Sequence, residues 1–216
     1  MPGVTISAGY GAGGSIIAPE VARQLGLPLL DRAISSRVAA QLQVSVQEAE
    51  CGVIRRSVSG RFLAVLAPLA GGVLGSAPPE VVPPLDDSAV FREQAEAIMR
   101  KAMVTGAVIL GRAGGAAFRD DLGVLRVRLF GPEAARIAQA ARIEDVDAAT
   151  ARQRLPEVDR ARAQYVRRLY SLSIDDPDLY HLQIDSTALP LDACANLIAT
   201  ACRHRLKVTS PVSTLR

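Results

Sequence analysis

The chain has 216 residues, 49% of them hydrophobic and 22% charged, which excludes disorder throughout and allows a well-filled core. Aromatic residues are 4% of the chain and tryptophan is absent, so the core must be aliphatic, as in helices packed on a parallel sheet. The net charge of +3 is modest, and only Lys101 and Lys207 among the 25 basic residues are lysine. We attribute this arginine bias to genome composition and predict no nucleic-acid partner, because the aromatic residues that stack on bases are scarce.

The cysteines and histidines do not form a metal-binding pattern. Cys51, Cys194 and Cys202 contain no CxxC pair, and neither His181 nor His204 is spaced from them as in a usual zinc site. We expect reduced thiols in the core of a cytosolic protein, and no dedicated metal ligands.

The start of the chain and its longest apolar run predict a cytoplasmic protein with no membrane contact. No charged-then-apolar leader is present, and the run over residues 62–75 is too short to span a bilayer and contains Pro68, Gly71 and Gly72. We expect this run to be buried against the core or against a second copy of the chain, which makes a homodimer one interpretation.

The first elements form a strand–helix–strand unit. Residues 4–8 are apolar enough for a buried strand, and residues 14–25 have apolar side chains at helical spacing, with Gly26 as the stop signal. Residues 27–31 form a short second strand that ends in the acid Asp31.

The middle of the chain is predicted to be a helical insertion over residues 34–103. Two helical segments cover about residues 33–43 and 45–56, and a further helix covers about 87–104. Residues 76–84 are a loop, because four prolines in nine residues prevent both helix and strand hydrogen bonding.

The rest of the chain alternates strands with helices. The expected strands are 107–111, 124–130 and 180–185, and the expected helices are 132–142, an arginine-rich helix over 146–170, and 191–205. With the first two strands this predicts an α/β fold: a five-stranded parallel sheet covered by helices on both faces. We therefore expect one domain over residues 1–216, with its core in 1–33 and 104–207.

The glycine loop after the first strand fits two templates. Gly9, Gly11 and Gly14 match the dinucleotide pattern G-x-G-x-x-G, and Asp31 follows at about the distance of a ribose-binding acid. A dinucleotide-binding oxidoreductase is thus one interpretation. Against it, no Tyr-x-x-x-Lys pair and no second mononucleotide half are present.

The second template is the phosphate-binding P-loop, G-x-x-x-x-G-K-[ST]. Gly9 and Gly14 have its spacing, but Ser15 and Ile16 replace the lysine and the hydroxyl residue that holds magnesium. A glycine-rich backbone at a helix N-terminus still suits phosphate binding. Ser15 has two interpretations, a helix cap or a phosphate ligand.

Three segments together resemble the cytidylate kinase-like family, a branch of the nucleoside monophosphate kinases. They are VTISAGYGAGGSIIAPEVARQLGLPLLDR, VILGRAGGAAFRD and VDRARAQYVRRLYSLSIDDPDLYHLQIDST. The resemblance implies a P-loop fold, ATP with magnesium as donor, and CMP or a similar nucleoside monophosphate as acceptor. It places the donor phosphates on Gly9, Gly11, Gly13, Gly14 and Ser15.

The chain departs from that family at two positions. Ser15 stands where members of this branch often have arginine, and Ala113 follows Arg112 where cytidylate kinases have Arg-Asp. The first departure bears on transfer and the second on the choice of CMP as acceptor.

The resemblance also implies the acceptor side of the site. Asp31, Arg32 and Arg112 are the expected substrate-binding residues, and Arg112 follows a central strand, where open α/β sheets bind ligands. The alternatives are that Asp31 caps the following helix and that Arg112 is a surface charge.

The arginine-rich region, about residues 147–178, is expected to act as a lid. Arg162, Arg168 and Asp159 are its candidate catalytic residues, because mobile arginines neutralise a transferring phosphoryl group. Asp159 either pairs with Arg162 or holds it in place. Helical spacing puts Arg162 and Tyr165 on one face, with Arg168 on Tyr165's side, while a solvated charged helix is the alternative.

Two functions remain besides the oxidoreductase. One is a nucleoside monophosphate kinase, and the other is a nucleotide-binding protein on the same fold with little or no transfer. The residues Ser15 and Ile16 favour the second.

Overall fold

The computed structural model describes residues 3–31, 87–111 and 113–209. Its five strands form one sheet in the order β2-β3-β1-β4-β5, and every neighbouring pair is parallel. The strands are β1 (Gly3–Ala8), β2 (Leu29–Leu30), β3 (Val108–Leu110), β4 (Val124–Phe130) and β5 (Leu182–Asp185). The predicted five-stranded parallel sheet is confirmed.

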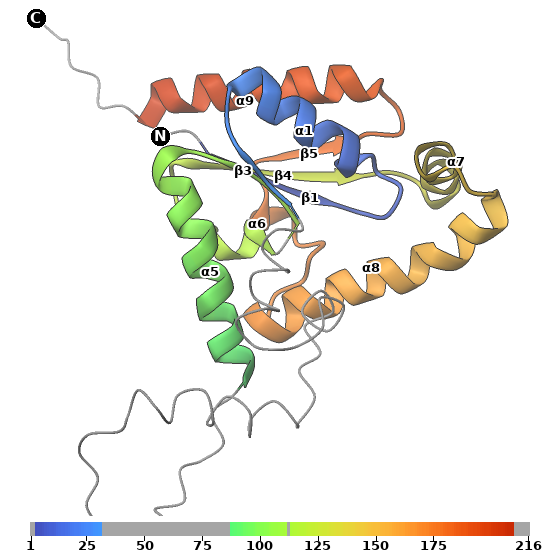
Figure 1. Cartoon of the computed structure of the whole chain (residues 1–216), viewed down its shortest axis with the longest axis horizontal. Helices are drawn as coiled ribbons and strands as arrows, with labels where there is room; N and C mark the ends of the chain where they lie inside the picture. Colours follow the sequence, from blue (N-terminus) through green and yellow to red (C-terminus); the bar gives the residue numbers. More distant parts are fainter. Residues whose placement is uncertain (1–2, 32–86, 112, 210–216) are drawn as a thin grey trace, which may run out of the picture.

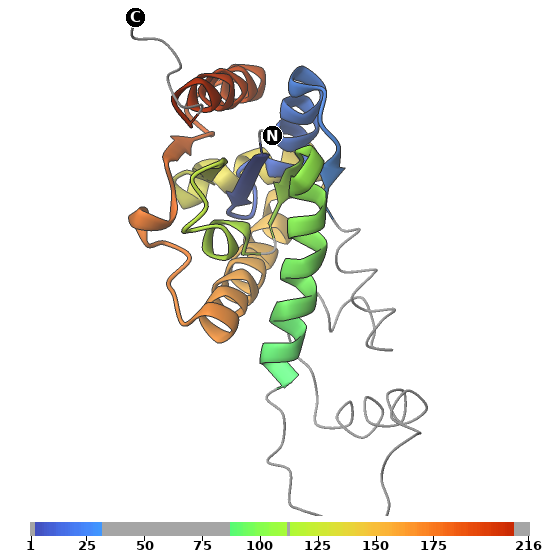
Figure 2. The same ribbon diagram turned by 90° about the vertical axis from the view of Figure 1, so that its left-hand side faces the viewer.

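Helices cover both faces of this sheet (Figures 1 and 2). They are α1 (Gly14–Leu25), α5 (Asp87–Thr105), α6 (Gly114–Ala117), α7 (Glu133–Glu144), α8 (Ala148–Tyr170), the 3-10 helix η1 (Pro177–Leu179) and α9 (Leu191–Thr209). Helices α1 and α9 lie side by side on one face, α5, α6 and α8 lie on the other, and α7 lies beyond the carboxyl end of β4 (Figure 1).

The core is aliphatic on one face of the sheet and mixed on the other. Val4 and Val127 of the central strands meet Ile17 of α1 and Ile198 of α9, all fully buried. The second cluster joins β3 to α5, α6 and α8, and Phe118 is its largest fully buried side chain. The aliphatic packing beneath α1 and α9 is the arrangement that the low aromatic content predicted, whereas the opposite face also buries Phe118 and Tyr165.

Several predicted strands are shorter in the structure. The edge strand β2 pairs only with β3, and its two residues are half-buried. Strand β3 stops at Leu110, because Gly111 takes a left-handed conformation with φ of 79°. Strand β5 begins at Leu182. The residue before it, His181, donates its main-chain amide to the Arg126 oxygen.

The helix boundaries follow local signals. Helix α8 begins where the Asp147 carboxylate accepts a hydrogen bond from the Thr150 amide at 2.6 Å. Helix α7 ends at Asp145, whose left-handed conformation stops it. The short helix α6 directly after β3 was not predicted, because four residues carry no periodicity.

The alternating arginines of β4 have structural partners. The buried Arg126 guanidinium donates to the main-chain oxygens of Leu179 and Phe118, at 2.8 and 3.1 Å. Arg128 pairs with Asp175 at 2.9 Å. Both arginines thereby tie the segment before β5 to the sheet.

Some predictions fall on residues outside the described ranges. They are the helices over 33–43 and 45–56, the proline loop and the contact of residues 62–74. Helix α5 confirms the helix predicted over 87–104. Cys194 and Cys202 are buried free thiols, as expected, while Cys51 is outside the described residues. In the part of the chain that the structure describes, no helix is long and apolar enough to cross a membrane.

Candidate active site at the carboxyl end of the sheet

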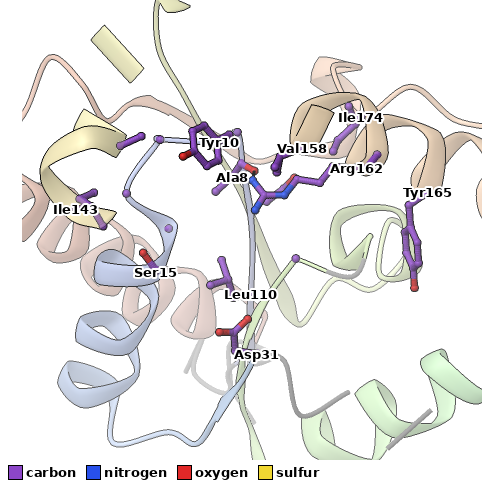
Figure 3. Close-up of a pocket in the computed structure, with 18 of the residues that line it drawn as sticks. Ala8, Tyr10, Ser15, Asp31, Leu110, Ile143, Val158, Arg162, Tyr165 and Ile174 are labelled. Atoms are coloured by element: carbon purple, nitrogen blue, oxygen red, sulfur yellow. Dashed lines mark hydrogen bonds between the residues drawn. The ribbon is translucent and has the colours of Figure 1, made fainter. Parts of the chain in front are cut away.

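A cavity of about 620 Å³ opens where β1 and β3 end. Its walls are the glycine loop, the end of β3, and helices α7 and α8 (Figure 3). The predicted site residues that line it are Gly9, Gly11, Gly13, Gly14, Ser15, Asp31 and Arg162. Residues from the first strand–helix–strand unit and from α8 therefore meet in one cavity.

The backbone of the glycine loop has a conformation that disfavours residues with a side chain. Gly11 and Gly13 have φ of 72° and 70°, and Gly13 is the N-cap of α1. A Cβ added to Gly14 would lie 2.7 Å from that of Ala8 on β1. The loop thus brings the N-terminus of a 12-residue helix, with its partial positive charge, to the cavity wall.

Side chains from distant elements bind the carbonyl groups of this loop. The Gln139 amide of α7 donates to the Gly11 oxygen at 2.9 Å, and the buried Ser186 hydroxyl donates to the Ala12 oxygen at 2.8 Å. These contacts satisfy carbonyls that a short loop leaves unpaired.

The two residues that depart from the P-loop pattern are both exposed. Ser15 lies in the first turn of α1 and lines the cavity. Because Gly13 is the N-cap, the interpretation of Ser15 as a helix cap is wrong. Ile16, at the position of the P-loop hydroxyl, is 48% exposed and can coordinate nothing.

Arg162 reaches from α8 to the end of β1. Its Nη1 donates to the Ala8 main-chain oxygen at 2.8 Å, one residue before the glycine loop (Figure 3). Tyr165 lines the same cavity, so the predicted shared face of Arg162 and Tyr165 is confirmed. Arg160 and Arg167 are exposed.

Asp159 has a partner that the sequence did not suggest. Its carboxylate forms an ion pair with Arg136 of α7, with 2.6 Å between Oδ2 and Nη1, and accepts a hydrogen bond from the Tyr10 amide at 2.7 Å. We expected Asp159 to pair with Arg162 or to hold it in place and did not predict this ion pair. The two helices follow each other in the sequence, but helical spacing does not show which of their side chains meet. Asp159 and Arg162 also line a smaller cavity of about 260 Å³ beside the first.

The remaining predicted residues lie in different places. Asp31 lines the main cavity at the end of β2, opposite Arg162 (Figure 3). Arg168 is exposed and is not among the described residues that line either cavity. Arg32 and Arg112 lie outside the described residues, as does the helix that Asp31 was expected to cap.

Sequence reasoning missed Arg136, Tyr10 and Glu144. The Tyr10 hydroxyl donates to Glu144 Oε2 at 2.8 Å, and Arg154 pairs with the same oxygen at 2.9 Å. Burial, and then the neighbouring Glu144 carboxylate, raise the pKa of Tyr10. Nothing in the sequence marked these residues, because each belongs to an ordinary helix or loop pattern.

The described residues that line the cavity offer few oxygen ligands for magnesium. Asp31 and Glu144 are its lining carboxylates, and Glu144 already accepts from Tyr10 and Arg154. Among the described residues no group of three or more His, Cys, Asp or Glu side chains could hold a metal ion. Magnesium commonly needs only one or two protein carboxylates beside substrate phosphates and water, and Asp31 suits that role.

Comparison with known proteins agrees with this geometry. An uncharacterized protein from Eubacterium ventriosum has a solved structure with a TM-score of 0.65 and 18% sequence identity, covering 93% of this chain and 97% of that one. A gluconokinase from Sinorhizobium meliloti has a TM-score of 0.50 and 14% identity, covering 97% of each chain. Among curated proteins no sequence matches the chain.

The parallel sheet and the glycine loop that opens α1 define an α/β protein with the P-loop kinase fold. Within that class, the model of the cytidylate kinase-like family matches residues 3–188. The chain belongs to the cytidylate kinase-like family.

Proposed function

We propose that this protein transfers a phosphoryl group from ATP to CMP or a similar nucleoside monophosphate. The observation that carries the proposal is the position of Arg162. Its guanidinium enters the cavity that the glycine loop lines, and bonds to Ala8 just before that loop. A cation there supplies the positive charge that the missing loop lysine gives other P-loop kinases.

The two sides of the cavity suit the two substrates. The amides at the N-terminus of α1, with Ser15, suit the donor phosphates, because both the helix dipole and free N–H groups attract anions. Asp31, on the opposite wall, suits the acceptor or a magnesium ion. Arg32 and Arg112 complete the proposed acceptor side. Phosphoryl transfer needs mainly positioning and charge neutralisation, which these groups provide.

A second candidate function is nucleotide binding with little or no transfer. The half-exposed Ile16 favours it, because an apolar side chain replaces the hydroxyl that holds magnesium in a P-loop. Such a protein would bind ATP as a sensor or as a partner-binding module.

Thermal shift tests the class of ligand. The panel is ATP, GTP, CMP, UMP, NAD and NADP, each with and without magnesium. We expect ATP to raise the melting temperature by several degrees, since stabilisation grows with ligand concentration over Kd. A shift with NAD alone would overturn the kinase proposal.

Release of ADP then separates the two candidates. We expect release to depend on a pyrimidine monophosphate, and to be lost in Arg162→Ala but kept in Arg160→Ala, an exposed arginine on the same helix. Binding of ATP without any ADP release would favour the second candidate.

A further inference from the structure

Side chains from helices α7 and α8 bind the main chain of Tyr10 in the glycine loop. Its amide donates to Asp159 Oδ1 of α8 at 2.7 Å, and its carbonyl accepts from Arg136 Nη1 of α7 at 3.0 Å. The same Nη1 lies 2.6 Å from Asp159 Oδ2. The three groups close a ring between residues that are 23 to 149 positions apart in the sequence.

The Arg136 side chain makes further contacts besides those with Tyr10 and Asp159. Its Nε donates to the Gly131 oxygen at 3.0 Å, and its side chain is 13% exposed. The guanidinium therefore bonds to the end of β4, to the loop and to α8 at once. A lysine has one ammonium group and could not reproduce this fork.

Two of the loop glycines also leave room for Arg136. A Cβ at Gly9 would lie 2.8 Å from Arg136 Nη1, and a Cβ at Gly11 would collide with the Arg136 carbonyl group. Two of the four glycines thus allow α7 to approach the loop from outside the nucleotide cavity. Their identity is explained by this packing as well as by phosphate.

Helix α8 meets the end of β1 at two points. Asp159 and Arg162 are three residues apart on one helix, so they lie on the same face. Asp159 binds the loop at Tyr10, while Arg162 binds Ala8 two residues earlier. The Asp159 contact therefore fixes the distance between Arg162 and the loop amides.

We propose that Arg136 and Asp159 are a positioning pair, which fastens the glycine loop to α8 and so sets Arg162 against the nucleotide site before nucleotide binds. Neither residue is among the described residues that line the main cavity. The nucleotide part of this proposal rests on the proposed function, whereas the fastening of the loop stands on the contacts alone.

The test combines hydrogen exchange of residues 9–14 with calorimetric ATP affinity, on the full chain. The variants are Arg136→Ala, Asp159→Ala, the double variant and Asp159→Asn, with Arg160→Ala as the matched control. Loss of either partner should speed exchange of the loop amides, since the closed loop opens more often. Asp159→Asn keeps an oxygen for the Tyr10 amide and should fall between wild type and Asp159→Ala.

For affinity we expect Kd for ATP to rise about tenfold in each single variant, or about 1.4 kcal/mol. The double variant should be no weaker than either single variant, because the two act as one unit. Arg160→Ala should match wild type in both measurements. Circular dichroism checks folding, and Asp159→Asn serves if an alanine variant does not fold.

Different outcomes overturn different claims. Unchanged loop exchange in Arg136→Ala and Asp159→Ala overturns the positioning pair. Faster exchange with unchanged affinity shows that the loop is fastened without consequence for the nucleotide, which also overturns it. If wild type binds no ATP, the proposed function fails, and loop exchange alone then decides whether the pair fastens the loop.

Discussion

Nη1 of Arg162 donates to the main-chain oxygen of Ala8 at 2.8 Å, across the carboxyl edge of the sheet. The proposed function gives this guanidinium the charge role of the missing loop lysine, so Arg162→Ala should lower ADP release at least a hundredfold, about 3 kcal/mol of transition-state stabilisation. The assay uses CMP, UMP and dCMP as acceptors. Full activity in Arg162→Ala, together with loss in Ser15→Ala, would reverse the roles that we give to the helix and the loop.

Ser15→Lys should raise the rate of transfer by up to about a hundredfold, because it adds a full charge beside the donor phosphates. Ser15 is exposed at the cavity wall, so a longer side chain has room. The measurement is again ADP release, with Ser15→Ala to separate charge from loss of the hydroxyl. A lysine variant that is less active than Ser15→Ala would show that the cavity has no place for a charge there.

Gly11→Ala should destabilise the protein by about 3 kcal/mol, since it combines a left-handed backbone with a collision against α7. Gly26→Ala is the matched control: its φ is 65°, and nothing lies within 4 Å of an added Cβ. There only the conformational strain applies, about 1 kcal/mol. Chemical denaturation measures the loss of stability in each of the two variants. Equal losses would mean that packing on α7 contributes nothing.

The stability of the protein should fall between pH 7 and pH 5 because of His181. Burial, and then the charges of Arg126 and Arg205, lower the pKa of His181 from 6.5 to about 4. Between these values the unfolded state binds more protons, so the free energy of unfolding rises with pH in this window and is lost as pH falls. This burial is partial and the residue as a whole is exposed, so solvent screening limits the effect to about 1 kcal/mol.

Thermal melts at pH 5 and pH 7 check this dependence. His181→Gln should flatten it, whereas His204→Gln on α9 should leave it as in wild type. An unchanged slope in His181→Gln would assign the pH dependence to other groups.

The elements of the core followed from local pattern. Residues 14–25 form α1 as predicted, because apolar spacing and the terminal Gly26 act within one helix. Residues 124–130 form β4 within the predicted bounds, since apolar residues that alternate with Arg126 and Arg128 have the period of a strand. The range predicted for the edge strand β2 was too long, because the length of an edge strand depends on its pairing with a single neighbour, here β3.

The glycines at 9, 11, 13 and 14 were enough to predict a phosphate-type loop between a strand and a helix, because spacing and backbone freedom are local properties. The partners of that loop depend on the tertiary fold. The arginine-rich pattern of α8 marked Asp159 as a candidate, but no signal marked Arg136 on α7 as its partner. They meet Tyr10 because the parallel sheet places the carboxyl ends of its strands, with the loops and helices attached to them, at one edge. The hydrogen bond from the Tyr10 amide to Asp159 joins residues 149 positions apart, so it depends on how α8 docks on the sheet, and helix periodicity does not encode it.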